Sequence, residues 1–220
     1  LHMSLFRDFF IALSNNTYLN ETAKKVGPRM GANKVVAGNT IPQLIETIQY
    51  LNEYRIAVTV DCLGEFVETK EESLHAKQQI LEIIEAIQYF NVEAHMSVKI
   101  SQLGSKFDLD LAYENMREIL LKADECGKMH INIDTEKYHS LQQIQHVLDK
   151  LKGEFKNVGT VVQAYLYEAE DLIDKYPDLR LRLVKGAYKE DETIAYQTKE
   201  DIDSNYIKII EKRLLNARNY

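Results

Sequence analysis

The sequence is poor in the residues that divide a chain into domains or staple small domains together. Its 220 residues include only three prolines, nine glycines and two cysteines, and no tryptophan. Cys62 and Cys126 have neither the spacing of a metal site nor the number needed for a disulfide framework. No proline-, glycine- or serine-rich stretch marks a linker. We therefore expect one main globular domain in a reducing, cytoplasmic compartment.

Long apolar runs and basic clusters are missing as well. No run approaches the roughly 18 apolar residues of a membrane-spanning helix, so we expect membrane association to be peripheral at most. The formal net charge is −7, without a lysine- and arginine-rich stripe for nucleic acid. The six histidines form no HxxxH or HxH pair, so we expect no metal site. Nothing in the sequence indicates an obligate protein partner.

The sequence does contain a regular alternation of strand and helix patterns. Runs rich in β-branched residues predict five strands, and apolar residues at three- and four-residue spacing predict a helix after each. The predicted strands are 56–63, 96–100, 130–134, 158–165 and 180–185, and the predicted helices are 70–90, 109–126, 141–151, 168–175 and 202–215. Such β-then-α units predict parallel strands with right-handed crossovers. No GxGxxG follows the first strand, which favours a (β/α)8 TIM-like barrel over a Rossmann sheet.

The residues before the first strand show only helical patterns, over 7–13 and 41–51. We predict an N-terminal helical segment over residues 1–55 and a barrel domain over 56–220. Five units cannot close a barrel of eight, so we expect the barrel to be incomplete at its C-terminal end. Thr69 and Glu72 have the spacing of a capping box, which predicts the start of the helix 70–90.

Polar residues stand at the ends of the predicted strands, where barrel enzymes assemble their active sites. They are Asp61, Glu65, Lys99, Asp134, Glu136, Gln163, Tyr165, Arg182, Lys185 and Tyr188. Several of them interrupt apolar strands, where a buried unpaired charge is costly. We therefore expect these residues to pair with one another or to bind a ligand.

The pattern alone leaves several interpretations open. Arg182 and Lys185 could form a structural ion-pair cluster with Asp134 or Glu136. A second possibility is a Schiff-base lyase or aldolase that uses Lys99 or Lys185. A third is a barrel module without catalysis.

The two acids after the first strand also have two interpretations. Asp61 and Glu65 could be paired carboxylates for acid–base chemistry or metal binding. We prefer a role in orienting the neighbouring lysine and loop.

Five phrases at successive strand ends resemble the FAD-dependent proline dehydrogenases of the bacterial monofunctional type. They are DCLGE at 61–65, VKIS at 98–101, IDTE at 133–136, VQAYL at 162–166 and RLVKGAY at 182–188, the last being the most specific. The resemblance spans about residues 56–206. It implies a distorted (β/α)8 barrel that holds FAD non-covalently over the strand ends. It also implies oxidation of L-proline to 1-pyrroline-5-carboxylate by hydride transfer to FAD, the first step of proline catabolism to glutamate.

The resemblance further implies roles for individual residues. Asp134 and Arg182 would be catalytic, with the arginine near flavin N5, and Lys99 and Tyr188 would bind substrate. FAD contacts would come from Thr135, Gln163, Lys185, Gly186, Ala187, Thr198 and Lys199. A quinone would accept the electrons, which implies a cytoplasmic flavoprotein that touches the inner face of the bacterial membrane at most peripherally.

The sequence departs from the family in what it lacks. The family continues with three more strands, a Thr-His strand end and a late helix whose adjacent arginines hold the proline carboxylate. Lys212 and Arg213 lie within the predicted helix 202–215 and do not replace that pair. We therefore expect these 220 residues alone to lack the principal carboxylate clamp.

Overall fold

The computed structural model describes residues 37–63 and 67–216 and divides the chain into two compact units, Leu1–Ile56 and Ala57–Tyr220. In the first unit the described helix is α3 (Ile41–Glu53), which confirms the helix predicted over 41–51. Thr40 caps it, because its side chain accepts a hydrogen bond from the Gln43 backbone N–H. The helix predicted over 7–13 lies outside the described residues.

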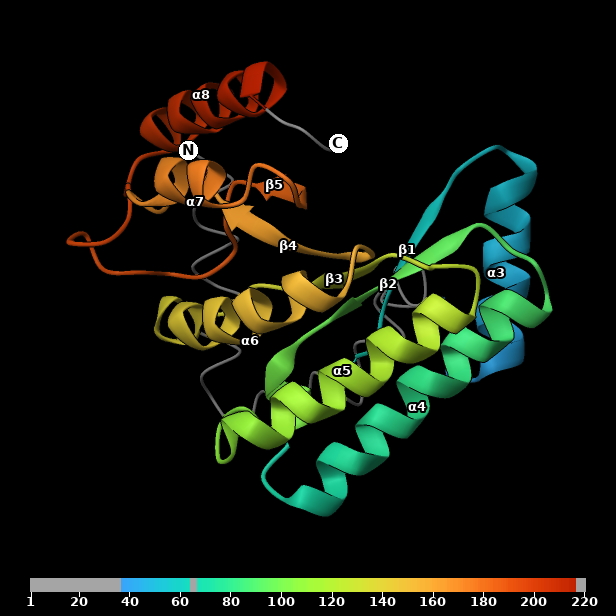
Figure 1. Ribbon diagram of the computed structural model, residues 1–220. Coiled ribbons are helices and arrows are strands. Elements are labelled where there is room, and N and C mark those ends of the chain that lie inside the picture. The colour runs from blue at the N-terminus through green and yellow to red at the C-terminus, as the bar shows by residue number, and fades with distance from the viewer. Residues whose placement is uncertain (1–36, 64–66, 217–220) are drawn as a thin grey trace, which may run out of the picture. The chain divides into compact units, whose positions relative to one another are not determined.

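The second unit is one parallel sheet with helices between its strands (Figure 1). Its strands are β1 (Val58–Asp61), β2 (Ala94–Val98), β3 (Ile131–Ile133), β4 (Val158–Gln163) and β5 (Arg180–Val184). Its α-helices are α4 (Lys70–Tyr89), α5 (Leu109–Glu125), α6 (Leu141–Glu154), α7 (Ala169–Lys175) and α8 (Lys199–Asn216), and short 3-10 helices are η3 (Ile100–Leu103) and η4 (Tyr138–Ser140). The strand order is β1-β2-β3-β4-β5, all parallel. This is part of a (β/α)8 barrel, as predicted.

Alternate residues along each strand face opposite sides of the sheet. Met96 and Ile131, which are paired in register, are fully buried, and so are Ile84 of α4 and Met116 of α5. The core therefore lies between the sheet and the helices that Figure 1 shows along it. Because side chains alternate along a strand, the intervening positions face the other, inner side of the sheet.

The inner side of the sheet is polar. Ser97, Asn132, Gly159 and Arg180 stand in register across β2 to β5. The Asn132 Nδ2 donates to Ser97 Oγ over 3.4 Å. Two residues beyond Ser97, Asn132 and Arg180, the same face carries the charged residues Lys99, Asp134 and Arg182.

Two features of the sheet differ from the prediction. The first strand, predicted over 56–63, is shorter and covers Val58–Asp61. Only Val60 of β1 is buried, because β1 forms one edge of the described sheet. The predicted strand 96–100 is shifted to Ala94–Val98, since the chain turns into η3 at Ile100.

The start of α4 is built as the sequence indicates. The Thr69 side chain accepts a hydrogen bond from the Glu72 N–H at 3.2 Å, and Glu72 Oε2 accepts one from the Thr69 N–H at 3.1 Å. Both halves of the predicted capping box are therefore present.

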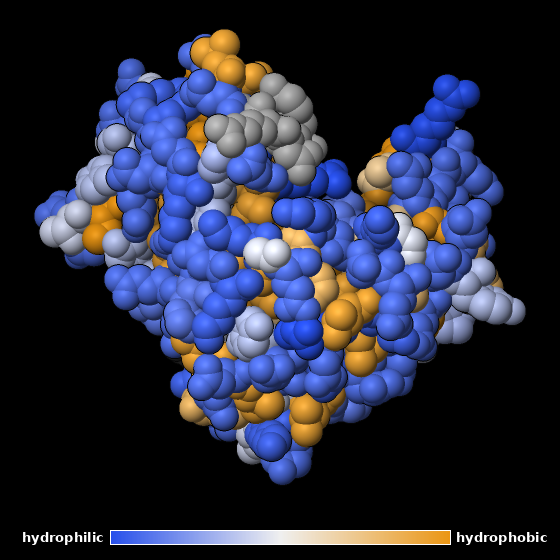
Figure 2. Space-filling view, in the orientation of Figure 1, coloured by the Kyte–Doolittle hydropathy of each residue, from blue (hydrophilic) through white to orange (hydrophobic). Residues whose placement is uncertain are grey.

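The surface of the second unit is mainly hydrophilic in the view of Figure 2, with apolar side chains reaching it over α8. Leu214 and Leu215 near the end of that helix are among the exposed apolar residues. Of the helices in the described part, none combines the length and the apolar character that crossing a membrane requires.

Candidate active site

Four charged side chains meet at the C-terminal ends of the strands. Lys99 follows β2, and its Nζ lies 2.7 Å from Asp61 Oδ2 at the end of β1 and 3.2 Å from Asp134 Oδ2 after β3. The Arg182 Nη2 in β5 donates to Asp134 Oδ1 over 2.7 Å. The charges thus alternate across the sheet from Asp61 through Lys99 and Asp134 to Arg182, and we call these four residues the charge row.

The strand register explains why the row forms. Val98 pairs with Ile133, so the next residues, Lys99 and Asp134, stand side by side. Val161 of β4 pairs with Arg182 and carries no charge. The guanidinium of Arg182 therefore reaches across β4 to its carboxylate on β3.

The row holds its lysine in the charged form. Burial by itself lowers the pKa of Lys99, but the hydrogen bond that Lys99 donates to Asp61 and the charge of Asp134 outweigh burial and raise it. A Schiff-base lysine needs a lowered pKa, because its neutral amine is the nucleophile. The environment of Lys99 is therefore opposite to the one that the lyase alternative requires.

Glu136 and Tyr188 lie beside the row. The Ser101 Oγ donates to Glu136 Oε1 over 2.6 Å, and the Gln163 Nε2 donates to the Glu136 backbone oxygen over 3.3 Å. Burial raises the pKa of Tyr188, and the charge of Glu136 raises it further, while Lys99 lowers it. The Tyr188 phenol is therefore within electrostatic range of both Glu136 and the row.

Lys185 and Lys199 form a second cluster through a shared partner. Lys185 Nζ lies 2.6 Å from Asp203 Oδ1, and Lys199 forms an ion pair with the other oxygen of the same carboxylate. These two lysines lower the pKa of Asp203, Lys185 having the larger effect. The interpretation of the strand ends as a structural ion-pair cluster placed Lys185 with Asp134 or Glu136. In the structure Lys185 pairs with Asp203 of α8.

Three other residues predicted to contact a cofactor have partners within the chain. Thr198 begins α8, because its Oγ1 accepts from the Asp201 N–H at 3.1 Å and donates to Asp201 Oδ2 at 2.6 Å. The Thr135 N–H donates to Asp134 Oδ1 over 2.9 Å, and the Thr135 side chain is buried. Gln163 is buried too, with its amide bonded as described above.

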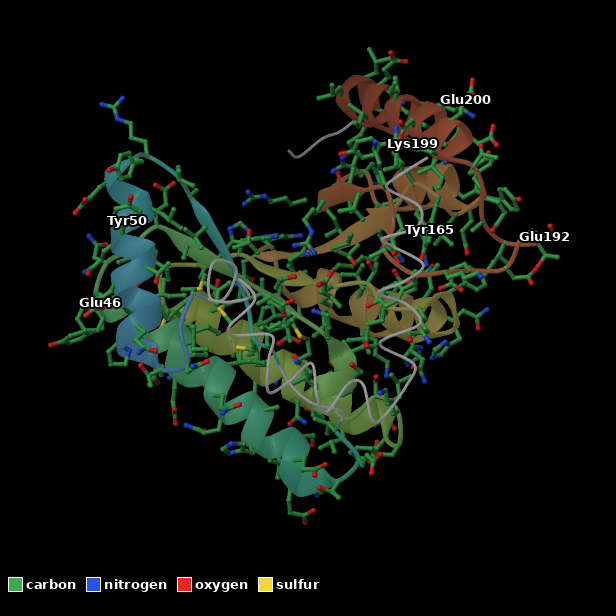
Figure 3. All side chains as sticks on the ribbon, turned by 180° about the vertical axis from the view of Figure 1, so that it is seen from behind. Glu46, Tyr50, Tyr165, Glu192, Lys199 and Glu200 are labelled. Carbon is green, nitrogen blue, oxygen red and sulfur yellow. The ribbon has the colours of Figure 1, made fainter. Side chains whose placement is uncertain are left out.

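Gly186 approaches an aromatic ring within the chain. Its φ is +115°, and a Cβ at this position would lie 2.6 Å from the ring of Tyr165. Figure 3 shows that ring inside the C-terminal part of the second unit. Both the positive φ and the close approach of the Tyr165 ring require a glycine at this position. Ala187 next to it is exposed.

A histidine pair on the inner face escaped the sequence prediction. The rings of His95 and His130 meet edge to face at 5.4 Å, and His95 Nε2 is hydrogen-bonded to Thr59 Oγ1 at 2.9 Å. Burial lowers the pKa of His130 to about 4, and the charge of Arg180 contributes. The two histidines meet because Met96 pairs with Ile131, which places residue 95 beside residue 130, and this register is not given by the sequence pattern.

Two further expectations concern the acids after the first strand and metal binding. Asp61 orients the neighbouring lysine, as we preferred, whereas Glu65 lies outside the described residues. In the described part of the chain, no three histidine, cysteine, aspartate or glutamate side chains are grouped as metal ligands would be.

Comparison with known proteins identifies the family. The family model described as proline dehydrogenase matches residues 44–220. The chain belongs to the proline dehydrogenase family. It is 42% identical over 213 residues to proline dehydrogenase 2 of Bacillus subtilis strain 168, covering 96% of this chain and 70% of the relative. The corresponding protein of B. subtilis subsp. natto is 41% identical over 217 residues, covering 98% and 71%.

A solved structure shares the fold of this proline dehydrogenase chain. It is proline utilization A (PutA) from Bdellovibrio bacteriovorus inactivated by N-propargylglycine, with a TM-score of 0.76 at 20% identity. The likeness covers 86% of this chain and 25% of that one, so the chain spans about a quarter of PutA. Membership in a family of flavin-dependent oxidoreductases gives no support to the lyase alternative.

Proposed function

We propose that the protein oxidises L-proline to 1-pyrroline-5-carboxylate with FAD as hydride acceptor and a quinone as the final electron acceptor. The observation that carries this proposal is the charge row at the strand ends of a proline dehydrogenase barrel. Substrates of barrel enzymes bind at this end, and the row offers both signs of charge to a zwitterionic amino acid.

In this proposal the row binds and orients proline. The Arg182 side chain is 41% exposed. A guanidinium has five N–H donors, so the Asp134 contact leaves others for a ligand. Asp134 fixes the position of both Lys99 and Arg182 and sets the local charge. Tyr188 would pack against the substrate from the loop that follows β5.

The residues of the second cluster fit the anionic part of FAD. Lys185 and Lys199 have side chains that are 49% and 77% exposed, and they share the single carboxylate of Asp203. These two exposed ammonium groups are the cations available to phosphate oxygens beside the N-terminus of α8, whose first turn also contains Glu200 and Asp201. When bound, FAD would supply the hydride acceptor.

The remaining proposed cofactor contacts differ in exposure and in whether their polar groups already have partners. Gly186 and Ala187 are small and exposed, so a flat ring could approach their backbone. Thr135, Gln163 and Thr198 already have hydrogen-bond partners within the chain. We assign these three residues the role of holding the neighbouring backbone and side chains of the cofactor site in place.

The proposed location follows from the acceptor. Quinones dissolve in membranes, so the reduced protein would meet its acceptor at the inner face of the bacterial membrane. Cys62 and Cys126 are both free, which supports the reducing, cytoplasmic side.

The test is an absorbance spectrum of the full-length protein before and after anaerobic addition of L-proline. We expect flavin bands that bleach with proline. Bands that persist unchanged, or a protein that binds no flavin after reconstitution, would contradict the proposal.

Two arginine variants sharpen this test. Arg182→Met removes an arginine–carboxylate pair at the strand ends, and Arg117→Met removes the exposed pair with Glu154 on α5 and α6. We expect Arg182→Met to slow flavin reduction by about 10²- to 10³-fold with flavin retained. Arg117→Met should react like the unmodified protein.

A further inference from the structure

Glu136 differs from the other carboxylates at the strand ends. Asp61 contacts Lys99, and Asp134 contacts both Lys99 and Arg182. Glu136 Oε1 accepts the hydroxyl of Ser101, while its Oε2 is buried without a hydrogen-bond partner among the described residues. A buried carboxylate oxygen without a donor costs about 1–3 kcal/mol or more. This oxygen therefore lacks a donor, and the described chain does not supply one.

The position of Glu136 is fixed from several strands. Ser101 follows β2 and holds its side chain, and Gln163 at the end of β4 holds its backbone oxygen. Among the charges that act on the Tyr188 phenol, that of Glu136 has the largest effect. The unpartnered oxygen thus lies at the substrate end of the barrel.

The charge balance says which kind of donor fits. Three carboxylates and two cations meet at this end: Asp61, Asp134, Glu136, Lys99 and Arg182. One negative charge is in excess, and Glu136 is the member without a cation in contact. A cationic N–H donor satisfies both the unpartnered oxygen and the excess charge.

We propose that Glu136 binds the ammonium group of proline through Oε2 and accepts its proton before the hydride leaves. This inference rests on the proposed function. An amine is mostly protonated at neutral pH, and a protonated nitrogen has no electron pair with which to form an imine. The N–H bond breaks, the proton moves to Oε2, and the electron pair stays on nitrogen. That pair then forms the C=N bond as the ring carbon gives its hydride to the flavin.

The neighbouring groups are less suited to this step. Asp61 and Asp134 are already in contact with cations of the charge row, so neither is left without a partner of opposite charge. The raised pKa of Lys99 keeps it protonated, and the raised pKa of Tyr188 keeps its phenol neutral. Other titratable groups on the loops at this end include Cys62, Lys137, Tyr138, Tyr165, Glu168, Lys185, Lys189 and Glu190.

The test compares Glu136→Gln with Glu192→Gln in the full-length, flavin-loaded protein. Both variants lose one carboxylate, but Glu192 is exposed at the tip of the loop before α8, as Figure 3 shows. The rate of anaerobic flavin reduction by proline is measured against pH. We expect Glu136→Gln to lose about 10²- to 10⁴-fold at neutral pH. Its rate should rise about tenfold per pH unit, because it depends on proline already deprotonated in solution.

Different outcomes separate the inference from the proposed function. If the unmodified protein is not reduced by proline, the proposed function fails. If it is reduced and Glu136→Gln keeps the same pH profile, Glu136 has only a structural role and the inference is overturned. Glu192→Gln should retain the unmodified profile, and a change there matching that of Glu136→Gln would also overturn it.

A second variant covers the case in which Glu136→Gln loses its flavin. Ser101→Ala removes the hydroxyl that donates a hydrogen bond to Glu136 Oε1, and a carboxylate that loses a donor is protonated more easily. The acid limb of the pH profile should move to higher pH. An unmoved acid limb would count against proton transfer to Glu136.

Discussion

Replacing Gly186 by alanine should destabilise the barrel unit substantially. The residue has a φ of +115°, which costs a side-chain-bearing residue about 1–3 kcal/mol. A Cβ would also lie 2.6 Å from the Tyr165 ring, which is buried. Tyr165 cannot retreat easily, because its backbone N–H is bonded to the Lys185 oxygen at 2.9 Å. Overpacking of this kind costs about 1–3 kcal/mol, so we expect a total loss of about 2–6 kcal/mol.

Urea unfolding followed by circular dichroism measures this loss, as a lower midpoint with an unchanged slope. The control is Gly153→Ala on α6, where nothing lies within 4 Å of the new Cβ and a gain of up to about 1 kcal/mol is expected. Adding Tyr165→Ala to each glycine variant separates the terms, because removing the ring should reduce the cost of Gly186→Ala. Equal midpoints for the two glycine variants would refute the reasoning.

Three further results follow from the structure. Asp134→Asn should lower the free energy of unfolding in urea by about 1.5–3 kcal/mol and slow flavin reduction, because Lys99 and Arg182 both lose the carboxylate that they contact. Unchanged stability would contradict this role of Asp134. Thr69→Ala should cost about 1 kcal/mol by removing the α4 cap, with flavin reduction unchanged. His130 binds its proton more weakly when folded, so its contribution is complete above its unfolded pKa of 6.5 and is lost as pH falls toward about 4. The free energy of unfolding should drop by up to about 3 kcal/mol across that window, and His130→Asn should flatten the drop.

Much of the fold could be predicted because local patterns determine it. The alternation of β-branched and amphipathic segments gave all five strands and their helices in order. The capping box at Thr69 also needs no tertiary information, since both partners lie within one turn. Exposure of β1 could not be predicted in the same way, because it depends on whether a strand has two neighbours in the sheet.

The candidate site was predictable in its membership but not in its pairing. Strand ends identified Lys99, Asp134 and Arg182, since parallel strands bring these ends together. Which cation meets which carboxylate depends on register and on side-chain reach. Lys185 thus pairs with Asp203, which lies 18 positions away on α8 and in no strand-end phrase. The i, i+4 spacing of Lys199 and Asp203 was the signal that could have found this residue.

The structural ion-pair interpretation accounts for only part of the strand-end cluster. It explains the charge row, in which Asp61, Lys99, Asp134 and Arg182 carry two negative and two positive charges at the ends of four strands. A cluster that served stability alone would gain from satisfying every buried polar atom, because each unpaired one is costly. Glu136 breaks that pattern, since Ser101 orients one carboxylate oxygen while the other is buried and unpartnered. The side chains of Asn157 and Tyr176 also have a buried oxygen without a partner, but neither lies in the strand-end cluster. Because Glu136 lies beside the charge row, a donor from a bound ligand could reach this end of the sheet and remove the cost.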